Sequence, residues 1–258
     1  MTEPLKLIVL ALIQGITEFL PVSSSGHLVL AEHFLKVRSA NVILEVTLHA
    51  GTMISVLVFY RRRILRLTQE LFSGEGEGRR YAVAVAVGSI PAAVAYALVG
   101  KKIEACFANP RGVAMLLCVT GAILLTLLRR PRSSTEVSGG RGLLVGLAQA
   151  LALLPGVSRS GATITAGRHL GLSPEKATEF SLLLSLPALG GAVAIKALEA
   201  AKMGTGGFTM PQLGLAATIS AVVGYAAIVC LVKTLTAGRL WVFGIYCLTV
   251  GVAGVLLL

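Results

Sequence analysis

Residues 14–27 concentrate groups that can do phosphate chemistry inside an otherwise apolar stretch. The segment reads QGITEFLPVSSSGH and carries Gln14, Glu18, three serines and His27. Gln14 and Glu18 are four residues apart, so on a helix they share one face and place an amide oxygen beside a carboxylate. Hard divalent cations prefer oxygen ligands of this kind, which makes the pair a candidate metal site. The alternative is that both side chains cap backbone groups or line an ordinary polar seam.

The next residues in this segment add hydroxyls and backbone N–H groups. Ser23, Ser24, Ser25 and Gly26 open the expected helix that follows, and the free N–H groups at a helix N-terminus bind phosphate well. The same residues would also serve as an ordinary helix cap and turn. We therefore predict that these four residues contact a phosphate of the substrate.

His27 lies beside these hydroxyls and is a candidate general base, general acid or nucleophile in phosphoryl transfer. If Ser24 begins a helix, Ser24 and His27 occupy neighbouring positions in its first turn. The Ser24 hydroxyl could then attack phosphorus while His27 takes its proton, or His27 could attack while Ser24 holds a phosphate oxygen. An activated water is the third nucleophile that the sequence leaves open. Three other histidines are weaker candidates, as readily structural as functional: His33, His49 and His169.

A second polar segment repeats the first at an offset of 135 residues. Gln14 falls on Gln149, and the remaining matches in register are Val22 on Val157, Ser23 on Ser158, Ser25 on Ser160 and Gly26 on Gly161. At an offset of 134, the segment 45–47 also resembles 179–181. The second copy supplies Ser158 and Ser160 together with Arg159, whose planar guanidinium matches phosphate oxygens. The alternative for Arg159 is a salt bridge to Glu18 or Glu179.

The composition identifies the surroundings of these segments as a membrane. Of the 258 residues, 55% are hydrophobic and 14% are charged, against about 25% charged in soluble domains. Mean hydropathy is +0.83. Six apolar runs have the length of roughly 20 residues that a membrane crossing needs, near 42–60, 81–100, 112–128, 176–198, 212–232 and 240–258. No stretch remains for a soluble domain, and we expect residues 5–20 to stay in the mature protein because they lack the basic start and cleavage site of a signal peptide.

The net charge of +11 comes from basic residues in short connections between the apolar runs. The arginines gather at 61–80 and 129–141, which the positive-inside rule assigns to the cytoplasm. This distribution argues against nucleic acid as a partner. The four cysteines have no metal or redox spacing and are interpreted as packing residues.

Residues 5–35 and 142–170 are apolar but are interrupted by polar and helix-breaking residues, and three expected spans separate them. An odd number of crossings gives the two copies opposite orientations, an arrangement that builds sites near the bilayer midplane. We predict an all-α integral membrane protein with an inverted-topology repeat, about six transmembrane helices and two re-entrant helix–loop–helix hairpins whose tips meet. The chain is one polytopic domain, with repeats near 1–130 and 140–258. Spans 42–60 and 176–198 would bring Glu45, His49 and Glu179 to the tips.

The two motifs together resemble a known family. Residues 14–27 are similar to the first signature of bacterial undecaprenyl-diphosphate phosphatases of the bacitracin-resistance type, and PGVSRSGAT at 155–163 is similar to the second. The resemblance covers nearly the whole chain. It implies that Glu18, Ser24, His27 and Arg159 are catalytic and that Thr163, at the end of the second signature, joins the substrate-binding residues. Many family members have Glu where this chain has Gln14, and an amide is a poorer cation ligand.

The family resemblance implies hydrolysis of undecaprenyl diphosphate to the monophosphate carrier used in cell-wall synthesis, with Mg²⁺ or Ca²⁺ as cofactor. It places the protein in the bacterial inner membrane with its active site facing the periplasm. The expected partners are a polyprenyl diphosphate lipid and the membrane, with a homodimer as a further expectation. The alternative function is a lipid flippase or small-molecule transporter, because inverted repeats with interrupted helices are also transporter architecture. Release of phosphate by the purified protein discriminates between the two.

Overall fold

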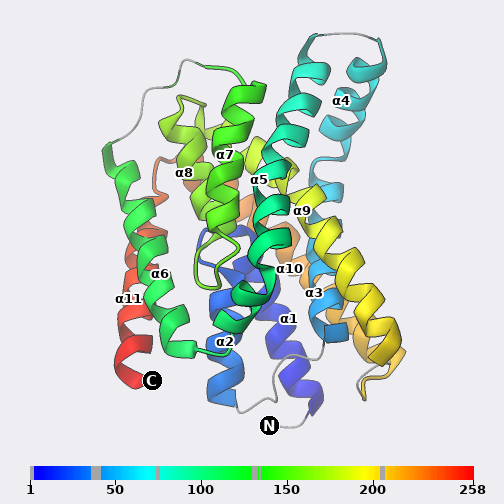
Figure 1. Ribbon diagram of the computed structural model, residues 1–258, viewed down its shortest axis with the longest axis vertical. Helices are drawn as coiled ribbons and strands as arrows, with labels where there is room; N and C mark the ends of the chain where they lie inside the picture. Colours follow the sequence, from blue (N-terminus) through cyan, green and yellow to red (C-terminus); the bar gives the residue numbers. More distant parts are fainter. Residues whose placement is uncertain (1–2, 36–41, 74–75, 130–132, 134, 204–206) are drawn as a thin grey trace.

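The computed structural model describes residues 3–35, 42–73, 76–129, 133, 135–203 and 207–258, and this part of the chain is helical throughout apart from turns and short connections. Figure 1 shows the helices as a bundle. The helices are α1 (Glu3–Phe19), α2 (Ser24–Leu35), α3 (Val42–Phe59), α4 (Arg61–Ser73), α5 (Gly76–Cys106), α6 (Pro110–Leu125), the 3₁₀ helix η1 (Thr126–Arg129), α7 (Gly139–Leu151), α8 (Arg159–His169), α9 (Pro174–Met203), α10 (Met210–Thr236) and α11 (Trp241–Leu257).

The apolar runs form the long helices of the bundle. Five helical segments in the described residues are long and apolar enough to cross a membrane, namely α3, α5, α6 continued by η1, α9 as far as Leu198, and α10. The run at 240–258 forms α11, an apolar helix of 17 residues, which is at the lower end of the length that spans a bilayer. Large apolar side chains remain exposed on these helices, as expected for surfaces that face lipid. The prediction of an all-α membrane protein is confirmed.

Small residues let the long helices approach closely. A Cβ atom added to Gly146 of α7 would lie 2.2 Å from the carbonyl oxygen of Gly88 on α5, and one added to Gly51 of α3 would lie 2.4 Å from that of Ala217 on α10. In lipid, where apolar side chains gain little by leaving the solvent, such close backbone contact is the usual basis of helix association. Glycine spacing therefore determines which helix faces pack together.

Two short helix pairs turn back inside the bundle. In Figure 1, α1 and α2 approach from the lower end of the molecule and meet at a turn near its middle, whereas α7 and α8 approach from the upper end. The main buried cluster contains residues of seven helices, among them Phe19 of α1, Ile164 of α8 and Phe180 of α9. The fold thus places the two polar motifs at its centre.

The basic connections lie at one end of the bundle. α4, the start of α7 and η1 are at the upper end of Figure 1, and α11 ends at the lower end. α4 is an amphipathic helix that buries no residue in the bundle and packs beside α5. The predicted basic segments also include Arg130, Arg132 and residues 74–75, which lie outside the described residues.

Candidate functional site

The first turn is built by Ser23, which ends the interruption between α1 and α2. Ser23 has a backbone φ of 70°, a conformation that non-glycine residues adopt rarely and that often marks functional sites. Its hydroxyl accepts a hydrogen bond from the Gly26 N–H at 3.2 Å, which caps α2, and contacts the Ser25 hydroxyl at 3.3 Å. The cap leaves Ser24, Ser25 and His27 on the partly exposed side of the first turn of α2.

The second turn repeats this capping arrangement. The Ser158 hydroxyl accepts from the Gly161 N–H at 3.1 Å and lies 3.2 Å from the Ser160 hydroxyl. Thr120 of α6 supports the turn, because its hydroxyl donates to the Gly156 carbonyl at 2.7 Å and accepts from the Ser158 N–H at 2.9 Å. Gly156 itself has a φ of 100°, and a Cβ there would lie 2.4 Å from the Val113 carbonyl oxygen, so only glycine fits.

The two turns are in contact through side chains. Arg159 Nη2 donates to Glu18 Oε1 at 2.6 Å, and the Ser160 hydroxyl donates to the Leu20 carbonyl at 3.2 Å. Glu18 is 6% exposed, so its negative charge is almost removed from solvent and depends on Arg159 for compensation. Only one hydrogen bond from the Arg159 guanidinium is found in the described residues, which leaves other N–H groups of its planar fork for an anionic ligand.

The Glu18 carboxylate also accepts a hydrogen bond from the Ser24 hydroxyl. The Ser24 Oγ donates to Glu18 Oε2 at 2.6 Å, and Gln14 Nε2 donates to the same oxygen at 3.1 Å. A short hydrogen bond from a hydroxyl to a carboxylate places an acceptor for the hydroxyl proton in direct contact with the candidate nucleophile. The geometry therefore favours Glu18, and not His27, as the group that takes the proton of Ser24.

His27 is held by two other contacts. Its Nδ1 lies 2.8 Å from the Ser23 carbonyl oxygen, and because a carbonyl only accepts, Nδ1 carries the proton. Its Nε2 is then an acceptor, and it accepts a hydrogen bond from the Tyr246 hydroxyl of α11 at 2.9 Å. The two rings are stacked, with centroids 5.6 Å apart and planes 5° from parallel. His27 thus presents a fixed, basic Nε2 at the partly exposed side of the first turn.

Several predicted substrate ligands are committed to bonds within the protein. Ser158 and Ser160 are each 2% exposed, and their hydroxyls hold the second turn and its contact with the first. The Thr163 hydroxyl bonds to the Arg159 carbonyl and lies 2.6 Å from the Ser181 hydroxyl of α9. In this arrangement the three residues position Arg159, whereas the partly exposed Ser24 and Ser25 are the hydroxyls open to a ligand.

The other ionisable residues predicted near the tips divide into two groups. His49 of α3 does approach the site, with Nε2 4.0 Å from Glu18 Oε2, and Glu45 lies one turn earlier on α3. Glu179 instead forms an ion pair with Arg63 of α4 at 3.0 Å. The prediction that Glu179 reaches the tips is wrong, because an arginine of the adjacent amphipathic helix compensates its charge. His169 bonds to Thr126 at 2.8 Å, also apart from the Glu18 cluster.

A cation at this site would be held by oxygen atoms. No group of three or more His, Cys, Asp or Glu side chains in the described residues has a metal-binding arrangement. Gln14 is fully buried, and its Oε1 has no hydrogen-bond partner although its Nε2 faces Glu18. An orphaned buried amide oxygen beside a carboxylate and the Ser24 hydroxyl fits Mg²⁺ or Ca²⁺ in donor chemistry, with phosphate oxygens of the substrate completing the set.

Tyr246 and Thr120 belong to the site but were missed in the sequence. Both lie in long apolar runs, where they were interpreted as parts of spanning helices. The signal that could have found Thr120 is the cost of a polar side chain in a membrane segment. Tyr246 carries a weaker signal, because tyrosine in such helices is ordinary near the membrane interface.

We predict that Tyr246→Phe lowers the kcat of phosphate release about fivefold and leaves the KM for the lipid substrate nearly unchanged. The variant keeps the ring stacked on His27 but loses the hydroxyl bond to Nε2, worth about 1 kcal/mol. Steady-state kinetics measure the two constants, with Tyr225→Phe as the control, because Tyr225 is exposed to a similar extent (41% against 44%) and packs on Phe59. An unchanged kcat in Tyr246→Phe would show that the hydroxyl does not orient His27.

Comparison with known proteins identifies the family. The model of the family described as "Bacitracin resistance protein BacA" matches residues 7–253. The chain belongs to the BacA family. Among its relatives, the protein named undecaprenyl-diphosphatase of Salinibacter ruber is 37% identical over 97% of this chain and 98% of its own length. Proteins with the same name from Trichlorobacter lovleyi and Rhodopirellula baltica are 39% and 36% identical, over 96% and 100% of this chain and 95% and 99% of their own lengths.

The match to the BacA family covers both polar turns together. The matched region contains both motifs and every helix that packs around them. The resemblance found in the two signatures is therefore confirmed over almost the full chain. The assignment of individual roles within the site depends on the geometry described above.

Proposed function

We propose that this BacA family member hydrolyses undecaprenyl diphosphate to undecaprenyl phosphate and inorganic phosphate, and so recycles the lipid carrier of cell-wall synthesis. The relatives named undecaprenyl-diphosphatase support the reaction and the substrate. The observation that carries the proposal is the cluster of Ser24, Glu18 and Arg159, which joins a hydroxyl, a proton acceptor and a phosphate-binding cation through two bonds of 2.6 Å.

In the first step, the Ser24 Oγ attacks the terminal phosphorus of the diphosphate. An Oγ–P bond forms and the anhydride P–O bond breaks, and its electron pair leaves on the bridging oxygen of the prenyl monophosphate. Glu18 Oε2 takes the hydroxyl proton through the existing hydrogen bond. The free N–H groups of Arg159 bind the phosphoryl oxygens, because phosphoryl transfer gains most from positioning and charge compensation.

In the second step, a water molecule attacks the phosphoserine. His27 Nε2, held as an acceptor by the bond of Nδ1 to the Ser23 carbonyl, takes a proton from the water once the water replaces the Tyr246 hydroxyl as its hydrogen-bond donor. The Oγ–P bond breaks, and the Ser24 oxygen regains its proton from Glu18. Inorganic phosphate leaves, and His27 returns its proton to solvent at the partly exposed side of the turn.

A divalent cation fits this site as a cofactor. Glu18, Gln14 Oε1 and the Ser24 hydroxyl would hold it together with oxygens of the diphosphate, as Mg²⁺ is commonly held by one or two carboxylates and substrate phosphates. When bound, the cation supplies positive charge that neutralises the phosphate groups. Because Arg159 already compensates Glu18, the diphosphate must contribute most of the negative charge that attracts the ion.

We expect EDTA to abolish phosphate release and Mg²⁺ or Ca²⁺ to restore it. The physical reason is that Arg159 alone leaves much of the charge of a diphosphate without compensation. The measurement is phosphate release by the purified protein in detergent, before and after dialysis against EDTA and on return of each cation. Full activity of the metal-free protein would contradict the cofactor assignment.

We also propose that the fold is an inverted repeat with two re-entrant hairpins. α2 begins at Ser24 and α8 at Arg159, which is the 135-residue offset of the motifs, and α5 and α10 begin 134 residues apart. The packing partners correspond as well, because α1 packs on α10 and α7 packs on α5. The two hairpins enter from opposite ends of the bundle in Figure 1, which gives their turns a shared place at mid-depth.

The proposed orientation places the upper end of Figure 1 in the cytoplasm. The arginine-bearing elements α4, the start of α5, η1 and the start of α7 lie at that end, which the positive-inside rule assigns to the cytoplasm. The protein would then reside in the inner membrane with its N-terminal hairpin entering from the periplasm. Ser24 and His27 lie on this hairpin, so the catalytic turn opens toward the periplasmic side.

Single-cysteine labelling tests this orientation. Ser73 ends α4, and Ser138 precedes α7, so both lie at the proposed cytoplasmic end. In a background without the native cysteines, we expect neither Ser73→Cys nor Ser138→Cys to react with an impermeant thiol reagent in intact cells, and both to react after permeabilisation. Asn109→Cys, in the connection before α6, is the opposite control and should react in intact cells. Labelling of Ser73→Cys from outside would refute the orientation.

Phosphate release tests the proposed function itself. The protein, purified in detergent, should release inorganic phosphate from a polyprenyl diphosphate and leave the polyprenyl monophosphate as the only lipid product. A protein that binds the lipid and moves it across vesicles without releasing phosphate would instead be the transporter alternative. The proposed homodimer is tested separately by the mass of the protein in lipid nanodiscs.

A further inference from the structure

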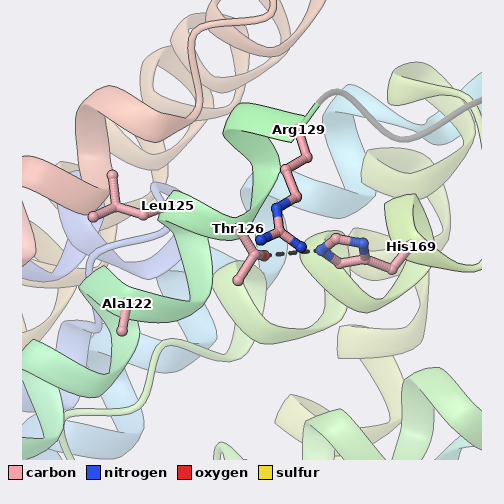
Figure 2. Close-up of a pocket in the computed structure, with 5 residues that line it drawn as sticks. All are labelled: Ala122, Leu125, Thr126, Arg129 and His169. Atoms are coloured by element: carbon pink, nitrogen blue, oxygen red, sulfur yellow. Dashed lines mark hydrogen bonds between the residues drawn. The ribbon is translucent and has the colours of Figure 1, made fainter.

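A hollow of about 530 Å³ lies beside η1, apart from the catalytic cluster. Its lining residues come from two regions: Ala122, Leu125, Thr126 and Arg129 from α6 and η1, and His169 from the end of α8. Figure 2 shows the Arg129 side chain directed toward Thr126 and His169. A volume of this size is within the range of small-molecule sites.

Of the polar groups in this hollow, Thr126 and His169 bond to each other, and Arg129 keeps its donors. The Thr126 hydroxyl donates to the Ile123 carbonyl at 2.6 Å, so its oxygen accepts from His169 Nε2 at 2.8 Å. That bond fixes the imidazole with a proton on Nε2, which in the neutral ring leaves Nδ1 as an acceptor. The Arg129 guanidinium has five N–H donors and no acceptor among the described residues, so it is the group here that can donate to an anion.

The local charge is positive. Neither 110–133 nor 155–172 contains an acidic residue, so no carboxylate from these segments compensates Arg129, whereas Arg168 has the carboxylate of Glu175 near it. Two helix ends meet here, those of η1 and α8, and their carbonyl groups together carry about one negative charge. Arg168 bonds to the Leu172 carbonyl and to Ser133 at 2.7 Å, whereas no ion pair of Arg129 is found in the described residues. The charge of Arg129 therefore remains for an external anion.

The rest of the hollow is apolar and faces outward. Ala122 and Leu125 line it toward the membrane interior, one to two turns of α6 away from Arg129. A cation at the membrane boundary above an apolar wall matches the two parts of an anionic phospholipid. We propose that the hollow between η1 and α8 is a binding site for an anionic phospholipid, with Arg129 on the phosphate and the wall of α6 on an acyl chain.

Native mass spectrometry of the purified protein tests this site with phosphatidylglycerol as the probe and phosphatidylcholine as the reference lipid. Wild type should retain phosphatidylglycerol in preference to phosphatidylcholine. Arg129→Gln should weaken this retention about fivefold, the effect of one basic residue at an anionic lipid surface. Arg66→Gln is the matched control. Arg66 is an exposed arginine on α4, so its substitution removes the same charge at a place away from the hollow.

A steric variant tests the site independently of charge and of any folding defect in Arg129→Gln. Ala122→Trp should fill the apolar wall and lower phosphatidylglycerol retention, whereas Met115→Trp, at an exposed position on the same helix, should leave it unchanged. Equal losses in Arg129→Gln and Arg66→Gln, or no loss in Ala122→Trp, would overturn the proposal. Displacement of the lipid by inorganic phosphate would identify a free-anion site and also overturn it.

Discussion

Ser24→Ala should lower the turnover of polyprenyl diphosphate at least ~1,000-fold, because removing the nucleophile of a covalent mechanism removes the reaction path itself. The Ser24 hydroxyl is partly exposed on the first turn of α2 and already donates to Glu18 Oε2 at 2.6 Å. Wild type quenched during turnover of substrate labelled in its terminal phosphate should carry the label on Ser24. Kinetics and peptide mapping by mass spectrometry measure the two effects.

The neighbouring serine provides the matched control for Ser24→Ala. Ser25 is also partly exposed, and its hydroxyl contacts Ser23 instead of a carboxylate. Ser25→Ala should retain the phosphorylated intermediate and lose less activity. Near-normal turnover in Ser24→Ala, or a label mapped to His27, would show that water or the imidazole attacks phosphorus. The phosphatase function would survive that result, but the proposed step would not.

Glu18→Gln should lower turnover at least ~100-fold, the usual effect of losing an acid–base group. Glutamine keeps the size of the side chain but cannot take the Ser24 proton, and it leaves Arg159 without its charged partner. Because breaking a buried ion pair costs about 3–5 kcal/mol, the free energy of unfolding must be measured beside kcat. Glu18→Asp, which keeps the charge at a shorter reach, should recover part of the activity.

An ion pair remote from the site separates the catalytic effect from ordinary loss of charge. Glu104 of α5 pairs with Lys196 of α9 at 3.1 Å and is exposed, so Glu104→Gln removes a carboxylate of an ion pair outside the site. That variant should keep near-normal turnover. If Glu18→Gln has ordinary turnover with an intact fold, the first turn only binds the lipid, and the transporter alternative gains support.

The long helices could be predicted from the sequence because their signal is local. An apolar run of about 20 residues has few alternatives to a helix in lipid, since every backbone N–H and C=O must find a partner within its own segment. The predicted span at 42–60 corresponds to α3, and that at 212–232 lies within α10. The interrupted segments were also visible, because Pro21 cannot continue α1.

The alignment of the two motif copies within the sequence predicted a second feature, the shared structure of the two turns. Matching Ser23 with Ser158 and Gly26 with Gly161 predicted that the two turns share one local structure, and both use a serine hydroxyl to cap the glycine N–H three residues later. Such a cap depends only on residues close in sequence. For this reason the repeat reveals both turns without any knowledge of the packing around them.

The partners of individual polar groups depended on packing between distant helices. Glu179 was expected at the tips but pairs with Arg63, because this arginine near the start of α4 lies 3.0 Å from its carboxylate. Tyr246 reaches His27 across 219 residues of sequence, and nothing in its own helix indicates that contact. Charge and hydrogen-bonding capacity are properties of a residue, whereas the nearest partner is a property of the fold.

The sequence by itself determined that this protein is a membrane-embedded helical protein with two related polar turns. It also determined which side chains can bind or transfer phosphate. Both results follow from hydropathy, capping and residue chemistry, which act over a few residues. Only the tertiary structure decided that Glu18 receives the Ser24 hydroxyl while Arg159 compensates its charge, and that Ser158, Ser160 and Thr163 are committed to internal bonds. A buried charge must find a counter-charge and a buried hydroxyl an acceptor, and several residues here could have met either need. Close packing of the helices selects one of them.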